Sequence, residues 1–155
     1  MDMGVALAAI GAALAVGLAG AGSAIGVSIA GKSATGVVAE KPELFGKVFV
    51  LQALPATQGI YGFLIAILTL TNIGLLGGGA VSLSDAHGWT YLAVGLAIGI
   101  TGLFSGAYQG QIAGAAIKMT GKDPSLSTRG MTMTVMVETY AILGLLVSIL
   151  IMFGM

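Results

Sequence analysis

One carboxylate stands alone in a strongly apolar part of the chain. Glu138 lies inside the run from Gly130 to Met155, and the nearest basic residue, Arg129, precedes that run. A run of this length predicts a transmembrane helix, because about 20 apolar residues cross the hydrocarbon layer. A charge at mid-depth costs roughly 2.5–3.5 kcal/mol, so such a residue needs partners and by default marks an ion or proton path. The alternative is a protonated Glu138 that only hydrogen-bonds a neighbouring helix.

Neutral oxygen donors occur in the other apolar segments. Thr57 offers a hydroxyl group, and Gln58 and Gln109 offer amide oxygens. Oxygen ligands suit hard cations, and with one carboxylate the site is neutral when Na⁺ or H⁺ is bound. A divalent ion would leave a charge in lipid, which is costly. We therefore expect Gln58 and Gln109 to face Glu138 as ligands, with interhelical hydrogen bonding as the alternative. Interhelical hydrogen bonding alone is expected for three other amides, Gln52, Asn72 and Gln111.

Four apolar segments must position these groups: residues 5–38, 46–76, 89–118 and 127–154. The chain is 57% hydrophobic and only 8% charged, whereas soluble domains contain about 25% charged residues. The alternation expected of membrane barrel strands is not seen. The sequence therefore predicts an all-α integral membrane protein with four transmembrane helices.

The four segments form two copies of one helical hairpin. A shift of 82 residues aligns the second segment with the fourth, so that Thr57 meets Thr139. We divide the chain into a first hairpin, 1–76, a connecting loop, 77–88, and a second hairpin, 89–155, which carries the carboxylate. Both copies have the same orientation, which makes this a parallel repeat.

The two copies differ at the carboxylate, because Ala56 stands in the first hairpin where Glu138 stands in the second. Stripes of small residues every four positions, Gly22 to Ala34 and Gly102 to Gly114, align slightly better at a shift of 80. Such stripes allow close helix packing. We expect them to pack many copies side by side, with packing inside one monomer as the alternative.

The charges predict an orientation in the cell membrane. All six basic residues lie in or beside the two short connections within the hairpins. By the positive-inside rule these loops are cytoplasmic, and both termini and the 77–88 loop are outside. Asp85 and His87 in that loop are expected to be solvated surface residues without chemistry.

Several classes of function are excluded. The chain has no Cys and one His, so thiol chemistry and a histidine metal site are not expected. No phosphate-binding glycine loop ends in Lys-Ser or Lys-Thr, and no Ser/His/Asp arrangement is plausible. The formal net charge is zero, which indicates no nucleic-acid partner. We assign no catalytic residue and expect that the chain is not itself an enzyme.

Two stretches, 54–62 (LPATQGIYG) and 137–144 (VETYAILG), resemble the proteolipid rotor subunit of V-type ATPases. The resemblance covers essentially the whole chain and is strongest to the bacterial sodium-translocating form, the K or c subunit. It implies a homo-oligomeric ring in membrane lipid that turns against a stator subunit with an essential arginine. It also implies that the cytoplasmic loops dock on a central-stalk subunit and that other subunits hydrolyse ATP.

The resemblance also implies which residues hold the ion. The Na⁺ ligands would be the Leu54 carbonyl, the Thr57 hydroxyl, the side-chain oxygens of Gln58 and Gln109, and Glu138. Tyr61 would hydrogen-bond Glu138 and lock the site. Each chain is expected to carry one Na⁺ past the stator. The alternatives are a proton-translocating rotor of the same architecture and a small oligomeric secondary transporter or channel.

Overall fold

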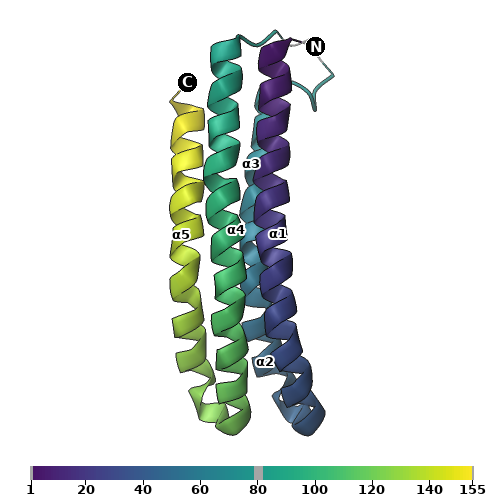
Figure 1. The fold of residues 1–155 in the computed structure, drawn as a ribbon, viewed down its shortest axis with the longest axis vertical. Coiled ribbons are helices and arrows are strands. Elements are labelled where there is room, and N and C mark those ends of the chain that lie inside the picture. The colour runs from purple at the N-terminus through teal and green to yellow at the C-terminus, as the bar shows by residue number, and fades with distance from the viewer. Residues whose placement is uncertain (1, 79–81, 155) are drawn as a thin grey trace.

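The computed structural model describes residues 2–78 and 82–154, which are almost entirely helical (Figure 1). The helices are α1 (Met3–Glu40), α2 (Phe45–Ala53), α3 (Thr57–Asn72), α4 (Asp85–Lys122) and α5 (Ser127–Phe153). Short 3₁₀ turns lie at Pro42–Leu44, Leu54–Ala56 and Pro124–Leu126. Within the described ranges, four stretches are long and apolar enough to cross a membrane: Met3–Glu40, Pro42–Asn72, Asp85–Lys122 and Pro124–Phe153. The predicted all-α membrane fold with four spans is confirmed.

The second span ends earlier than the sequence predicts. α3 stops at Asn72 rather than at residue 76. The backbone then turns through Gly74 and Gly78, whose φ angles are 76° and 71°. Glycine adopts this left-handed region readily because it has no Cβ. Apolar composition alone does not reveal such a turn.

The third span begins earlier than the sequence predicts. α4 starts at Asp85, because the Ser84 hydroxyl accepts a hydrogen bond from the His87 backbone N–H and caps the helix. The predicted loop 77–88 is therefore wrong at its C-terminal end. Asp85 and His87 are exposed, as expected. Residues 79–81, which belong to the same predicted loop, lie outside the described residues.

Small residues bring α1 and α4 into backbone contact. A Cβ added to Gly106 would lie 2.6 Å from the carbonyl carbon of Gly22 and 2.8 Å from the amide nitrogen of Ser23. A Cβ added to Gly26 would overlap the Gly106 carbonyl oxygen. Figure 1 shows α1 and α4 side by side along the bundle. The two small-residue stripes therefore meet inside one chain. Our expectation that these stripes pack separate copies is wrong.

The ends of α1 and α4 show that the structural repeat is 82 residues long. α1 spans Met3–Glu40 and α4 spans Asp85–Lys122, so both ends of these helices differ by 82 positions. The first and third 3₁₀ turns differ by the same number. The better glycine match at a shift of 80 has another origin: a Cβ on Gly22 would lie 2.5 Å from the Gly102 carbonyl oxygen. Those residues are contact partners rather than duplicates.

Both short turns lie at one end of the bundle, opposite the two termini (Figure 1). There the Lys41 Nζ donates a hydrogen bond to the Gly121 carbonyl at 2.6 Å. The Lys47 Nζ donates to the Pro124 carbonyl at 3.1 Å. Gly121 belongs to the last turn of α4, where helical carbonyls lack partners within the helix. These two bonds tie the first hairpin to the second.

Candidate ion-binding site

The helical period of α5 turns Glu138 towards the interior of the bundle. The side chain is 7% exposed. Thr134 and Ala141, one turn before and after it, are fully buried, whereas Met136 and Tyr140 are 64% and 65% exposed. Residues three and four apart share one face of a helix. The carboxylate therefore projects into the protein and not into the surrounding medium.

Pro55 interrupts the second span in the region of the site. It lies in the 3₁₀ turn Leu54–Ala56, because proline has no N–H with which to continue the helical ladder. Across this turn the Thr57 hydroxyl donates a hydrogen bond to the Leu54 carbonyl at 3.0 Å. Gln58 then stands in the first turn of α3 and is fully buried. The interruption of the helix at Pro55 therefore places the Leu54 carbonyl, the Thr57 hydroxyl and the Gln58 side-chain amide close together.

The side chains predicted for the site form one hydrogen-bonded network. The Tyr61 hydroxyl donates to Glu138 Oε1 at 2.5 Å, and Gln109 Nε2 donates to Glu138 Oε2 at 3.4 Å. Gln58 Nε2 donates to Gln109 Oε1 at 2.5 Å. The Thr57 hydroxyl lies 3.4 Å from Gln58 Oε1. The Thr57 hydroxyl also bonds the Leu54 carbonyl, so Leu54 belongs to the same network. The structure thus brings together all six predicted site residues, which come from α3, α4, α5 and the 3₁₀ turn Leu54–Ala56.

Two serines in this region were missed from the sequence. The Ser105 hydroxyl accepts a hydrogen bond from Gln58 Nε2 at 3.1 Å and donates to the Val137 carbonyl at 2.9 Å. The Ser23 hydroxyl accepts from the Gly59 amide at 2.8 Å. Ser105 lies four residues before Gln109, and this spacing on one helix face is the signal that could have identified it.

The three amides that we assigned to interhelical bonding lie elsewhere. Asn72 and Gln111 are exposed on the surface of the chain, and Gln52 is half-buried. Asn72 and Gln111 therefore face away from the other helices of this chain. Their prediction as interhelical hydrogen-bonding groups stays a prediction, to be met by helices of a neighbouring copy.

The chemistry of the network suits a monovalent cation or a proton. Both side-chain donors to Glu138, the Tyr61 hydroxyl and the Gln109 amide, are neutral groups. Neither cancels the charge of the carboxylate, which in a membrane interior is costly to leave uncompensated. The remaining nearby groups, Thr57 and Gln58, contribute neutral oxygens, the donors that hard cations prefer.

Fold and site together define a class of protein: a duplicated helical hairpin in the membrane with one buried carboxylate for each pair of hairpins. The model of the ATP synthase C subunit family matches residues 10–69 and 92–151. The two matches are offset by the same 82 residues as the structural repeat. The chain belongs to this family. It is a non-catalytic, multi-pass membrane proteolipid of the rotor of a V- or A-type ATPase.

Curated relatives fit this assignment. The V-type sodium ATPase subunit K of Enterococcus hirae is 43% identical over 119 residues, covering 77% of this chain and 72% of the relative. The A-type ATP synthase subunit K of Methanocaldococcus jannaschii is 46% identical over 148 residues, covering 96% of this chain but 62% of the relative's length. The V-type proton ATPase 16 kDa proteolipid subunit of Chrysotila carterae is 27% identical over 118 residues, covering 76% of this chain and 71% of the relative. Membership of this family sets aside the small transporter or channel considered from the sequence.

Proposed function

We propose that this chain forms a homo-oligomeric rotor ring that translocates Na⁺, with one ion carried by each chain at Glu138. The observation that carries the proposal is a buried carboxylate whose side-chain partners are neutral donors. A cation supplied from outside the chain completes such a site. The sodium ATPase named among the relatives supports Na⁺ as that cation.

The proposed ligands are the oxygens already gathered at the proline break and on the facing helices. They are the Leu54 carbonyl, the Thr57 hydroxyl, the side-chain oxygens of Gln58 and Gln109, and the Glu138 carboxylate. Tyr61 is not a ligand in this proposal. Its hydroxyl holds one carboxylate oxygen, so that the other oxygen stays oriented towards the Gln109 amide.

Neutralisation of Glu138 is the step that permits rotation. An ion from one aqueous half-channel cancels the charge, and the neutral site then passes through lipid at a much lower energetic cost than a bare carboxylate. Near an essential arginine of the stator, the Glu138 carboxylate releases its ion, because the positively charged arginine takes the place of the ion. The ion leaves by the second half-channel, and the site is ready to reload.

The orientation follows from the lysine-rich end of the bundle. We place both short turns in the cytoplasm, where they dock on a central-stalk subunit, and both termini outside. The turns are held as one platform by the Lys41–Gly121 and Lys47–Pro124 hydrogen bonds. A positively charged end on the cytoplasmic side agrees with the positive-inside rule.

A proton rotor of the same architecture is the second candidate. One relative is a proteolipid of a V-type proton ATPase, and Glu138 held by Tyr61 is compatible with a protonated carboxyl group as cargo. In that case Thr57, Gln58 and Gln109 serve only as hydrogen-bonding groups between helices. Dependence of ion binding on Na⁺ at fixed pH separates the two candidates.

The test is the substitution Glu138→Gln in the complete ATPase reconstituted into vesicles. We expect ATP-driven Na⁺ uptake to be lost while the ring still assembles, because glutamine keeps the shape but not the charge. Asp85→Asn, at an exposed carboxylate at the start of α4, the end of the bundle away from the short turns, is the control and should transport normally. Na⁺ uptake that persists in the Glu138→Gln complex contradicts the proposal.

A further inference from the structure

The buried serine Ser105 lies between the proposed Na⁺ ligands and the backbone of α5. Its side chain is 3% exposed and belongs to α4, one turn before Gln109. Its hydroxyl donates a hydrogen bond to the Val137 carbonyl oxygen at 2.9 Å. A carbonyl oxygen can only accept, and a hydroxyl has one proton to donate. Ser105 can therefore act only as an acceptor towards any other group.

This restriction decides which end of the Gln58 side-chain amide faces Ser105. The Gln58 atom at 3.1 Å from the Ser105 hydroxyl must be a donor, and it is Nε2. Nε2 also donates to Gln109 Oε1 at 2.5 Å, so both of its protons are bonded. Gln109 is itself held by the backbone of α5, because its Nε2 donates to the Thr134 carbonyl at 3.2 Å. The amide oxygen of Gln58 is left free, and it lies 3.4 Å from the Thr57 hydroxyl.

The free oxygen of Gln58 is placed to share a cation with Thr57. The Thr57 hydroxyl has one proton, and the nearer acceptor is the Leu54 carbonyl at 3.0 Å rather than Gln58 Oε1 at 3.4 Å. The two side-chain oxygens then both offer unshared electron pairs, which suits a hard cation. A reversed amide would bring the protons of Gln58 Nε2 to this place and would repel a cation. The direction of the amide therefore decides whether Gln58 is a ligand.

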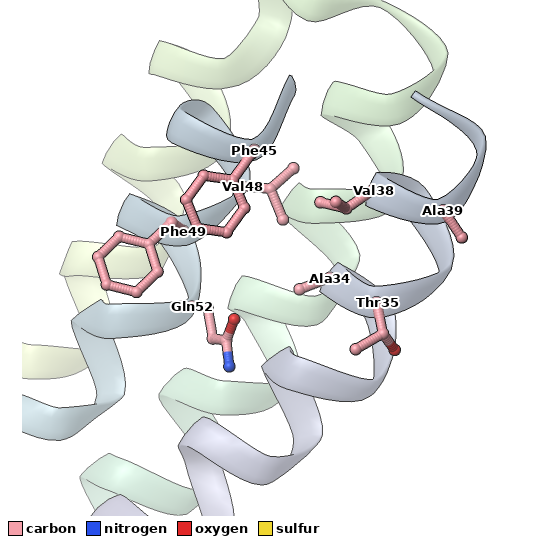
Figure 2. A pocket seen from close by; sticks show the side chains of 8 residues that line it. All are labelled: Ala34, Thr35, Val38, Ala39, Phe45, Val48, Phe49 and Gln52. Atoms are coloured by element: carbon pink, nitrogen blue, oxygen red, sulfur yellow. The ribbon is translucent and has the colours of Figure 1, made fainter. Parts of the chain in front are cut away.

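Gln52, in the same membrane span, is a glutamine without such an acceptor. Its side chain lines a groove of about 360 Å³ between α1 and α2, where Figure 2 shows it together with Phe49 and Ala34. Among the described residues no group forms a hydrogen bond with its amide, so both directions of that amide are open. A glutamine in this span is thus not oriented by its own helix. Gln58 owes its fixed direction to the groups around it, and Ser105 is the one that can only accept.

We propose that Ser105 is a positioning residue for Na⁺, because its hydroxyl holds the Gln58 amide with Oε1 turned towards the ion. The inference rests on the proposed sodium-translocating function, and it adds a residue that favours Na⁺ over H⁺. A proton binds to the Glu138 carboxylate itself and does not use the oxygen of Gln58. Loss of the Ser105 hydroxyl therefore weakens Na⁺ binding and leaves proton binding unchanged.

The substitution Ser105→Ala in the purified ring tests this role. The assay is the rate at which a carbodiimide labels Glu138, since the reagent attacks the protonated carboxyl group and bound Na⁺ slows it. At fixed pH, the Na⁺ concentration that halves the rate should rise roughly 2- to 12-fold, the range that corresponds to one neutral hydrogen bond. Without Na⁺, the pH dependence of labelling should match that of the natural ring. A general disturbance of the site would change both measurements.

Ser148→Ala is the matched control. Ser148 is a fully buried serine of α5 whose hydroxyl donates to the Val94 carbonyl of α4 at 2.9 Å. Ser105→Ala and Ser148→Ala therefore each remove one serine-to-carbonyl hydrogen bond between the same two helices. Only Ser105 also accepts a hydrogen bond from Gln58. Ser148→Ala should bind Na⁺ as tightly as the natural ring.

A second variant, Ser105→Cys, keeps a side chain of similar shape and offers a weaker acceptor. It should also weaken Na⁺ binding, by a smaller factor than Ser105→Ala. The inference is overturned if either assembled variant binds Na⁺ as tightly as the natural ring, or if Ser148→Ala weakens binding equally. A changed pH dependence of labelling without Na⁺ also overturns it. If Na⁺ does not slow labelling of the natural ring, the proposed function fails, and that measurement is made first so that the two failures are distinguished.

Discussion

Tyr61 provides the sharpest test of how the site holds its ion. Its hydroxyl donates to Glu138 Oε1 at 2.5 Å, whereas the Gln109 amide lies at 3.4 Å from the other oxygen. Tyr61 is therefore the stronger of the two donors. A hydrogen bond to a charged group contributes about 1.5–3 kcal/mol. This contribution applies where the site is shielded from water. Where water reaches the carboxylate, a water molecule can replace the hydrogen bond from the Tyr61 hydroxyl.

The substitution Tyr61→Phe removes this donor and keeps the aromatic ring. We expect Na⁺ to bind roughly 10- to 150-fold more weakly, which is that free energy converted to an affinity ratio. The assay is equilibrium binding of radioactive sodium to the purified ring at constant pH. Tyr140→Phe is the matched control, because Tyr140 lies on α5 close to Glu138 but is 65% exposed. An affinity for Tyr61→Phe within twofold of the natural protein would refute the role of the phenol.

Three further predictions follow from individual contacts. Gln109→Leu should abolish binding of Na⁺ to the ring, whereas Gln111→Leu, at an exposed position, should bind Na⁺ normally in the same assay. Gly106→Val should prevent accumulation of a stable chain in membranes, because its Cβ would meet α1 backbone within 3 Å, while Gly36→Ala, with no atom within 4 Å, should accumulate normally. Hydrogen bonds from Ser125 lower the pKa of the Asp123 carboxyl. Asp123→Ala should therefore lower the temperature at which the chain unfolds at neutral pH, and the difference should vanish as pH falls through that lowered pKa.

The central residue of the site was visible in the sequence because its environment is unusual. A single carboxylate in an apolar run has few explanations in a membrane protein, and Glu138 needed no structure to be recognised. Thr57 and Gln58 follow a proline within an apolar segment, which marked them as well. The structure adds that Tyr61 and Gln109 reach the two different oxygens of the carboxylate.

The serines and the helix faces were not visible in the same way. Ser105 and Ser23 are common residue types in membrane helices, and their role depends on which face meets which neighbour. The small-residue stripes could pack within or between copies, and composition does not decide between these arrangements. Only the structure shows that Gly22 and Gly106 are in backbone contact inside one chain. The start of α4 depended on one capping bond from His87 to Ser84, a local interaction that hydrophobicity does not report.

The most direct test of the central claim is the rate of carbodiimide labelling of Glu138 in the purified ring, with Na⁺ and pH varied independently. The reagent attacks the protonated carboxyl group, so a bound cation competes with labelling. We predict that Na⁺, but not K⁺, slows labelling of Glu138 at fixed pH. If only a rise in pH slows labelling, the site takes protons, and the role of Thr57, Gln58 and Gln109 as sodium ligands is contradicted.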